Sequence, residues 1–261
     1  MENKDLLIQQ WLEEEKEAHI HGWDFSHIHN RYEEEKDLPW DYEKIVRKYL
    51  SPEKKVLDID TGGGEFLLSL GHPNENLAAT EAYPPNVQLC RETLLPLGID
   101  FKEALAEKHL PFKTNSFDLV LNRHGDYNVS EIYRVLKPGG VFLTEQVGAE
   151  NDRDLVELLY EQAPPLPYPE QYLSITENKF RETGFTLLGG EEAWRPIKFY
   201  DTGALVWFAR IIEWEFPGFS VENNLKGLFR AQKLLQEKGV IQGRIHRYLL
   251  SAAKYPEKKN G

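Results

Sequence analysis

The fold of this chain is decided by the stretch Lys55-Val56-Leu57-Asp58-Ile59-Asp60-Thr61-Gly62-Gly63-Gly64-Glu65-Phe66. An apolar strand ends abruptly in three glycines, and a helix is expected to begin near Glu65. Glycines let the backbone turn sharply and approach a ligand closely, and the first turn of such a helix directs unpaired N–H groups at that ligand. The stretch therefore predicts a site for a nucleotide-like ligand.

A carboxylate ends the next predicted strand. This strand covers residues 76 to 81 and ends in Glu81, 19 positions after Gly62. In doubly wound folds an acid at about this separation binds the ribose hydroxyls of the nucleotide. A solvated strand end is the alternative for Glu81. We favour ribose binding because the glycines and the acid agree in their spacing.

The glycine spacing argues against a dinucleotide. A dinucleotide-binding loop needs the pattern G-x-G-x-x-G, which does not fit here. If the pattern begins at Gly62, its last glycine falls on Leu67, and if it begins at residue 60, its first and last positions are the acids Asp60 and Glu65. Asp58 and Asp60 lie two residues apart on one strand, so they point to the same side and could hold a cationic group. S-adenosylmethionine carries such cations, an ammonium and a sulfonium.

Further segments extend the pattern in a recognisable order. Leu110-Pro111-Phe112 precedes Ser116-Phe117-Asp118-Leu119-Val120-Leu121, and Glu131-Ile132-Tyr133-Arg134-Val135-Leu136-Lys137-Pro138-Gly139-Gly140 follows. With the glycine loop and the acid, these segments resemble the class I S-adenosylmethionine-dependent methyltransferases, the broad group that includes many small-molecule methyltransferases. The resemblance covers roughly residues 45 to 148 and is much looser outside them.

The resemblance implies S-adenosylmethionine as cofactor and S-adenosylhomocysteine as its product. It also implies an acid near the adenine just before the Leu110-Pro111-Phe112 segment, for which Glu107 is the candidate and Glu103 a substitute. The residues expected to bind the cofactor are Asp58, Asp60, Thr61, Gly62, Gly63, Gly64, Glu81, Ala82, Glu107 and Asn122.

Asp60 departs from the family pattern, which usually has glycine at this position. Two roles are open. Asp60 either caps the turn by accepting nearby N–H groups or contacts the amine of the cofactor directly. In both cases its charge would repel the methionine carboxylate if the two came close.

The alternation of predicted strands and helices indicates an α/β fold. We expect a doubly wound, mostly parallel, seven-stranded Rossmann-like sheet in residues 51–261, with the core motifs at 55–148 and an inserted apolar helix at 201–214 before the last strand, at 248–253. Residues 1–50 are expected to form an N-terminal helical cap or lid. Packing alone could equally explain the aromatic residues there, and the candidate lid residues are Trp23, Asp24, Phe25, Trp40 and Tyr42.

Methyl transfer is an in-line displacement, so the enzyme mainly aligns the acceptor and excludes water. A general base helps if the acceptor is a hydroxyl or a carbon acid. Candidates lie at the ends of the fourth and fifth predicted strands, and His124 is favoured because imidazole titrates near neutrality. A hydrogen-bonded structural role for His124 is the alternative, while Arg123 could hold an acidic substrate. The other candidates are Asn122, Asp126 and Glu145.

Composition narrows the partners. The 261 residues are 41% apolar, enough for a full core, and carry a formal net charge of −12. This charge makes nucleic-acid binding unlikely, because a polyanion would be repelled over most of the surface. Neither a signal peptide nor a membrane span is evident, and Cys90 is the single cysteine, so we expect a cytoplasmic protein whose Cys90 packs inside a helix. The sequence does not predict the oligomeric state.

Two His-x-His pairs raise a metal hypothesis. They are His19-Ile20-His21 and His27-Ile28-His29. Residues two apart on a helix point in different directions, and no acid or cysteine pattern completes a familiar site, so we expect no metal.

Three classes of function remain open. The first is methyl transfer to a small-molecule acceptor, at oxygen, nitrogen or carbon. The second is an RNA or protein methyltransferase, which would need a basic groove or an open cleft. The third is a non-catalytic regulatory protein that binds S-adenosylmethionine, which Asp60 makes conceivable.

Overall fold

The computed structural model describes residues 4–19, 24–34 and 37–255. It divides into two compact units, each built from three chain segments. Unit 1 consists of residues 1–38, 148–169 and 193–246, and unit 2 consists of residues 39–147, 170–192 and 247–261. These bounds differ from the predicted division at residue 50, and the assignment of a lid and a methyltransferase domain stays a prediction.

The described strands form one mixed sheet of eight. Its order is β1-β7-β8-β6-β5-β2-β3-β4. Strands β2 to β6 pair in parallel along β4-β3-β2-β5-β6, whereas β8 pairs with β6 and β1 with β7 in antiparallel fashion. The strands are β1 (Tyr32–Glu34), β2 (Val56–Ile59), β3 (Leu77–Glu81), β4 (Asp100–Glu103), β5 (Phe117–Arg123), β6 (Leu136–Val147), β7 (Thr186–Phe199) and β8 (Ile241–Ala253).

The predicted α/β fold is confirmed, with one strand more than expected. The additional strand is β1, which has only three residues and no apolar alternation, so no sequence pattern marked it. The last strand, β8, is longer than predicted, and β7 and β8 each contribute residues to both units.

In unit 2 the sheet register brings the ends of the parallel strands to one edge. Ile59 of β2 lies opposite Thr80 of β3 on one side and Asn122 of β5 on the other. Arg123, the last residue of β5, lies opposite Glu145 of β6. The loops that leave β2, β3 and β5 therefore start from the same edge, where ligands bind in open α/β sheets.

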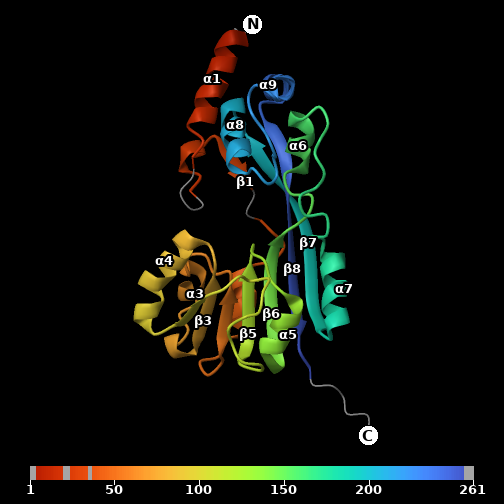
Figure 1. Ribbon diagram of the computed structural model, residues 1–261. Helices are drawn as coiled ribbons and strands as arrows, with labels where there is room; N and C mark the ends of the chain where they lie inside the picture. The colour runs from red at the N-terminus through yellow and green to blue at the C-terminus, as the bar shows by residue number, and fades with distance from the viewer. Residues whose placement is uncertain (1–3, 20–23, 35–36, 256–261) are drawn as a thin grey trace. The chain divides into compact units, whose positions relative to one another are not determined.

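In unit 2, helix α3 begins at Glu65, as expected from the glycine loop. Helix α4 packs on β3 and β4, and α5 packs against α7 (Figure 1). Helix α4 ends at Thr93, and the 3-10 turn η3 (Leu95–Leu97), which contains Pro96, follows it. The helices are α2 (Tyr42–Tyr49), α3 (Glu65–Ser69), α4 (Pro84–Thr93), α5 (Val129–Val135) and α7 (Leu173–Thr183), with the 3-10 turn η2 (Asn74–Asn76) before β3.

Unit 1 is largely helical in its described part. Helix α1 packs against α8, and α9 packs against both α6 and α8. Its elements are α1 (Lys4–Lys16), the 3-10 turn η1 (Ser26–Ile28), α6 (Arg153–Leu159), α8 (Thr202–Ile211) and α9 (Leu225–Lys238), together with β1 and parts of β7 and β8.

The inserted apolar helix is present as α8 but is shorter than predicted. Asp201 caps it by accepting the Ala204 N–H, and Trp207 is 1% exposed in the core of unit 1. Trp214, expected inside this helix, lies beyond its end and is exposed. Helix α9 was not predicted, although Leu228 and Ala231, both buried, already show helical spacing in the sequence.

Candidate functional site

The glycine loop joins β2 to α3 in a conformation that requires glycine. Gly62 and Gly64 have φ angles of +64° and +85°, in the left-handed region, and Gly64 is the N-cap of α3. A Cβ on Gly64 would lie 2.7 Å from a methyl group of Leu94. The Thr61 N–H donates to the Thr80 carbonyl (3.0 Å), which ties the loop to the neighbouring strand.

Glu81 lies against this loop, as its spacing from Gly62 predicts. Its carboxylate is 3% exposed and accepts the Gly62 N–H at 2.8 Å. Its other oxygen accepts the N–H groups of Ala82 (2.8 Å) and Tyr83 (2.9 Å). The acid and the glycine loop, 19 residues apart in the chain, thus meet at the carboxyl ends of β2 and β3.

More carboxyl groups than positively charged groups lie around the glycine loop. Burial raises the pKa of Asp58 to about 7, although the Thr61 hydroxyl donates to this carboxyl at 2.6 Å and Arg123 also favours its ionised form. Burial and the charge of Glu81 raise the pKa of Asp60 to about 6. Carboxyl groups that resist ionisation in this way fit a cationic ligand and would repel a pyrophosphate.

Asp60 contacts the turn after β5. Its φ angle of +58° lies in the left-handed region, which explains how aspartate can stand where the family has glycine. Its carboxylate accepts the backbone N–H of Asp126, and a Cβ added to Gly125 would lie 2.4 Å from Asp60 Oδ2. The Asp60 carboxylate therefore lies beside the turn after β5, and both roles considered for it stay predictions.

Asn122 is completely buried and joins three strands. Its amide donates to the carbonyls of Ile59 (3.0 Å) and Asp126 (3.2 Å), and its oxygen accepts from Thr144 and Gln146 of β6. These contacts hold the edge of the sheet in place. They favour a structural role for Asn122 over the catalytic and cofactor-binding roles predicted for it, which stay predictions.

Arg123 and His124 extend from the exposed end of β5. The Arg123 guanidinium lies over the ring of Phe66 in α3, 4.8 Å from its centre. His124 has a φ angle of +57°, and its backbone N–H donates to the backbone carbonyl of Glu145 at 2.9 Å. Burial lowers the pKa of His124, and the positive charges of Arg247 and Arg123 act in the same direction, so a neutral imidazole is favoured near pH 7.

Glu145 and Trp40 adjoin His124. Nε2 of His124 lies 3.4 Å from Glu145 Oε1, and the Trp40 indole N–H donates to Glu145 Oε2 at 2.6 Å. Glu145 was one of several strand-end candidates, and Trp40 was predicted only as a lid aromatic. No local pattern could pair two residues 105 positions apart.

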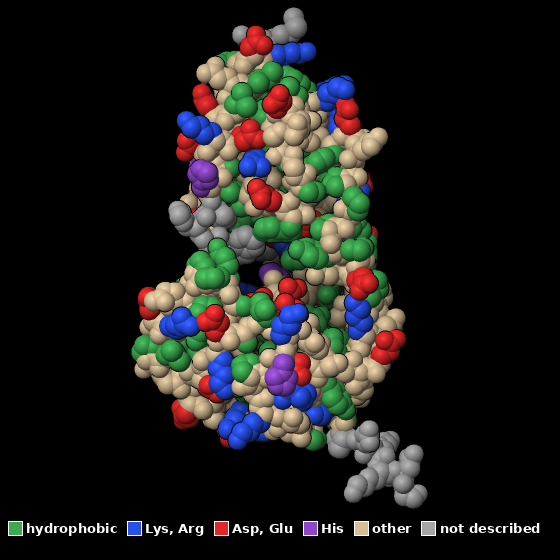
Figure 2. Space-filling model, in the orientation of Figure 1, with side chains coloured by type: hydrophobic (Ala, Val, Ile, Leu, Met, Phe, Trp, Pro, Cys, Tyr) green, Lys and Arg blue, Asp and Glu red, His purple; other side chains and the backbone are tan. Residues whose placement is uncertain are grey.

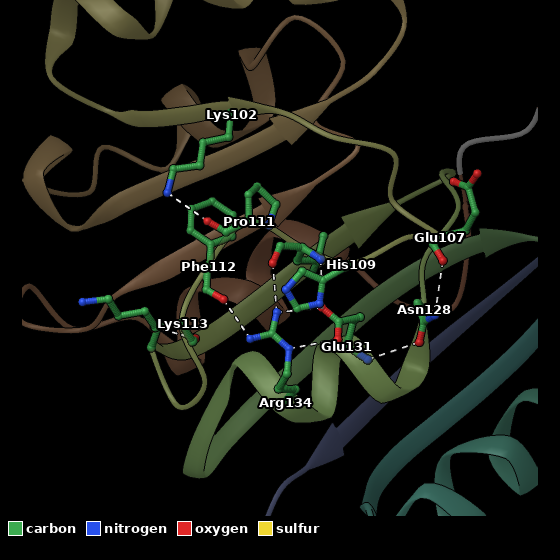
Figure 3. A network of polar contacts seen from close by, with 11 residues as sticks. Lys102, Glu107, His109, Pro111, Phe112, Lys113, Asn128, Glu131 and Arg134 are labelled. Atoms are coloured by element: carbon green, nitrogen blue, oxygen red, sulfur yellow. Dashed lines mark hydrogen bonds and ion pairs between the residues drawn. The ribbon is translucent and has the colours of Figure 1, made fainter.

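Glu107, expected near the adenine, is exposed, and its carboxylate points away from the polar network that surrounds it (Figure 3). Its carbonyl accepts from the Asn128 amide at 3.2 Å. Glu103, the substitute, forms a 2.6 Å ion pair with Arg91 on the exposed surface. The role of Glu107 in cofactor binding stays a prediction.

The network in Figure 3 explains the charged residues of the family-like segment before β6. Arg134 donates to both oxygens of Glu131 and to the carbonyls of Leu110 and Phe112. Glu131 also accepts the Leu110 N–H, and the Arg134 guanidinium holds the pKa of Glu131 low, at about 2. These two residues thus fasten the Leu110-Pro111-Phe112 segment to α5.

The candidate lid residues fall in both units. Tyr42, in unit 2, is buried and donates to the carbonyls of Asn122 and Leu143 at 3.2 Å each. Phe25, in unit 1, packs against Tyr32, Trp207 and Phe208. The side chain of Asp24 accepts the Ser26 N–H, and Trp23 lies outside the described residues.

Unit 1 contains a pocket of about 520 Å³ between α1, α8 and α9. Residues 201–203, at the start of α8, line it, whereas Trp207 and Phe208 of the same helix are buried in the core. At its wall the Arg31 guanidinium pairs with Asp201 at 2.7 Å and with Glu14 at 2.6 Å.

Within the described ranges, no three His, Cys, Asp or Glu side chains are grouped closely enough to hold a metal ion. His21 of the first His-x-His pair lies outside those ranges. Cys90 is buried in α4, as predicted, and its thiol donates to the Gly62 carbonyl at 3.1 Å. The described helices include none with the length and apolarity needed to cross a membrane.

Comparisons with known proteins match the same part of the chain. Residues 57–144 match the sequence model of a methyltransferase-domain family. The ubiquinone/menaquinone biosynthesis C-methyltransferase UbiE of Cupriavidus pinatubonensis is 31% identical over 112 residues, which are 39% of this chain and 46% of that protein. A phthiotriol/phenolphthiotriol dimycocerosates methyltransferase of Mycobacterium tuberculosis is 32% identical over 99 residues, 34% of this chain and 36% of that protein. The chain thus spans less than half the length of either relative.

Solved structures share the fold over a longer stretch. A proposed methyltransferase from Bacillus halodurans C-125 superposes with a TM-score of 0.56 at 21% identity, covering 83% of this chain and 99% of that one. A protein of unknown function from Deinococcus radiodurans R1 gives a TM-score of 0.55 at 15% identity and covers 97% of this chain and 100% of that one. Together, the sequence match and the shared fold support a class I S-adenosylmethionine-dependent methyltransferase domain that contains residues 57–144.

Proposed function

We propose that this protein transfers a methyl group from S-adenosylmethionine to a small-molecule acceptor and releases S-adenosylhomocysteine. One observation carries the proposal: the buried Glu81 carboxylate binds the Gly62 N–H of a glycine loop that opens a helix at the carboxyl end of a parallel strand. This arrangement is typical of nucleoside recognition.

The residues around the loop fit S-adenosylmethionine. Asp58 and Asp60 supply negative charge for its cations, and their raised pKa values support the presence of a cationic partner in the working state. Glu81 would hold the ribose hydroxyls, next to Ala82. Thr61, Gly63 and the other loop residues would bind through their backbone. Glu107 remains the candidate for the adenine end.

When bound, S-adenosylmethionine supplies a methyl group on a positively charged sulfur, which any aligned nucleophile can attack. The chain then needs to orient the acceptor and, for an acidic acceptor, to remove its proton. His124 is our candidate base, because its pKa is lowered and about a third of its side chain is exposed. Arg123 could hold an anionic group of the acceptor.

A small acceptor is favoured by the names of the relatives. They refer to quinone biosynthesis in one case and to phthiotriol dimycocerosates in the other. On the face drawn in Figure 2, Lys and Arg side chains are scattered among Asp and Glu and form no continuous basic surface. This distribution disfavours RNA as the substrate.

A regulatory protein that only binds the cofactor is the second candidate. Asp60 favours it, because a carboxylate at this family glycine adds a third acid beside Asp58 and Glu81. In that case S-adenosylmethionine would bind and no acceptor would be methylated.

Isothermal titration with S-adenosylmethionine and S-adenosylhomocysteine tests the proposal, with NAD and NADP as controls. We expect saturable binding of the first two only. Binding of NAD would replace the proposal with a dinucleotide enzyme, and binding of none would remove the glycine loop as a nucleotide site. A screen of phenols, quinols, carbon acids and amines for release of S-adenosylhomocysteine then separates the enzyme from the regulatory protein.

A further inference from the structure

The contacts of Trp40, Glu145 and His124 form a chain that ends at the proposed base. Trp40 is 8% exposed and donates its indole N–H to Glu145 Oε2 at 2.6 Å. The second oxygen of Glu145 lies 3.4 Å from His124 Nε2. The exposed fraction of the side chain increases in this series of contacts, from 10% for Glu145 to 35% for His124. The buried Glu145 carboxylate is therefore fixed by Trp40 on one side and faces the partly exposed imidazole of His124 on the other.

Glu145 is held in its ionised form. Burial alone would raise its pKa, but the hydrogen bonds from His124 and Trp40 outweigh burial, so its pKa is lowered. An ionised carboxylate can only accept hydrogen bonds. The hydrogen of the neutral imidazole is therefore favoured on Nε2, the nitrogen that lies 3.4 Å from this carboxylate.

The other ring nitrogen is then the basic one. In a neutral imidazole with hydrogen on Nε2, the lone pair is on Nδ1. Among the described residues none is hydrogen-bonded to Nδ1 of His124. The charged groups that act on this ring are Glu145 of β6, Arg123 of β5 and Arg247 of β8, and the two cations favour the neutral ring.

The backbone around His124 is equally fixed. Gln146 donates to the Gly125 carbonyl at 3.2 Å, and Asn122 donates to the Asp126 carbonyl at 3.2 Å. The ring therefore projects from a turn that is bound on both sides to the sheet. Such fixed support is what a general base requires, because small displacements weaken proton transfer.

We propose that Glu145 and Trp40 are positioning residues that hold His124 in the Nε2–H form with Nδ1 as the base, and that the acceptor is a hydroxyl or a carbon acid. The proposal rests on the methyltransferase function proposed above. The acceptor oxygen or carbon forms the bond to the methyl group, and the sulfur–methyl bond breaks with its electron pair staying on sulfur. The acceptor proton passes to Nδ1, and the imidazolium is stabilised by Glu145 until the proton leaves to water.

Long-range ¹H–¹⁵N NMR of the full-length ¹⁵N-labelled protein tests the positioning role without any acceptor. The His124 signals are assigned by their loss in His124→Gln. In the wild type we expect the Nε2–H form. In Glu145→Gln the pKa of His124 should fall by about one unit, because the anion that stabilises the imidazolium is gone, and the two neutral forms should mix. In Trp40→Phe the forms should also mix, but the pKa should not fall, because the carboxylate remains.

Two controls belong to the same spectra. His109, which lies 3.1 Å from Glu131 and is 75% exposed, should be unchanged by both substitutions. Glu103→Gln removes an exposed carboxylate of β4 and should leave the His124 signals as in the wild type. Circular dichroism shows whether each variant folds, and the wild-type signals alone test the Nε2–H form if a variant does not.

Three results would overturn the inference. They are a wild-type His124 with hydrogen on Nδ1, an unchanged His124 pKa and form in folded Glu145→Gln, and methylation of an amine while phenols, quinols and carbon acids fail. Failure of the methyltransferase proposal is distinguishable. In that case S-adenosylmethionine would not bind in calorimetry, whatever form His124 takes.

Discussion

Two regions at the same edge of unit 2 differ in how they are built. At the ends of β2 and β3, the glycine loop and Glu81 lie within 20 consecutive residues and interact largely through backbone N–H groups. At the ends of β5 and β6, Glu145 contacts both His124 and Trp40, and Trp40 comes from far earlier in the chain. The proposed cofactor site is thus encoded in a short motif, whereas the proposed base depends on long-range contacts.

The two regions also differ in their electrostatics. Near the glycine loop burial raises the pKa values of Asp58 and Asp60, and the neighbouring carboxylates add to this effect. Beside His124 the pKa of Glu145 is lowered by its hydrogen-bond donors. The first region is suited to a cation that arrives with a ligand, and the second to a proton that leaves an acceptor.

The largest expected effect separates the two regions. His124→Ala should lower kcat by about 10²- to 10⁴-fold, the usual contribution of a general base, while calorimetry shows unchanged S-adenosylmethionine affinity. Turnover is measured on the acceptor that emerges from the screen. Equal losses of turnover and cofactor affinity would show a structural role for His124 and would remove the distinction drawn here.

The next effect concerns the first region alone. Glu81→Ala should weaken S-adenosylmethionine binding by roughly 1–3 kcal/mol, or about 5- to 150-fold, because charge-assisted hydrogen bonds are lost. Asp100→Ala is the matched control, since Asp100 begins the neighbouring strand β4 but lies beside Lys102 on the exposed surface. If both variants bind like the wild type, Glu81 does not contact the cofactor.

A smaller effect is expected from pH. The folded-state pKa of Asp58, about 7, lies above its unfolded value, so its protonation stabilises the free protein at acid pH, and this contribution is lost as the pH rises through about 7. A cationic ligand favours the ionised form. Binding of S-adenosylmethionine at pH 6.5 should therefore release protons, which calorimetry in two buffers of different ionisation enthalpy detects. The Asp58→Asn variant should release fewer protons than the wild type. Equal proton release by the two proteins would show that Asp58 is not the group that ionises when the ligand binds.

The smallest effect separates loop conformation from ligand contact. Gly62 and Gly71 have similar φ angles, +64° and +63°, and a Cβ on either would meet no atom within 4 Å. Alanine at each should lower the free energy of unfolding by about 1 kcal/mol, because the left-handed conformation is strained for residues with a Cβ. Only Gly62→Ala should also weaken S-adenosylmethionine binding, several-fold. Equal cofactor affinity in both variants would show that the ligand does not approach the backbone at Gly62.

The sequence predicted those parts of the molecule whose causes are local. The strand before the glycine loop and the helix that begins at Glu65 could be located because an apolar run followed by three glycines marks them. The meeting of Glu81 with Gly62 followed from one spacing rule. The eighth strand, helix α9 and the lengths of β7 and β8 were missed, because short or polar elements are specified by their tertiary partners.

Within the site, the limits of prediction have the same origin. Asp60 was recognised as unusual, but its contact with the turn at Gly125 depends on how β2 and β5 pair. The network of Asn122 likewise depends on strand register. Such contacts join residues that are distant in sequence, and no single-chain pattern specifies them.

The division of β8 between the two units has a consequence for synthesis. During translation a domain folds once all of its segments have left the ribosome. Unit 1 draws on residues up to 246, and unit 2 on residues from 247 onward, including the part of β8 that pairs with β6. Neither unit has its complete set of strands before β8 emerges, so both should finish folding late and almost together, and β6 waits with one edge unpaired until then.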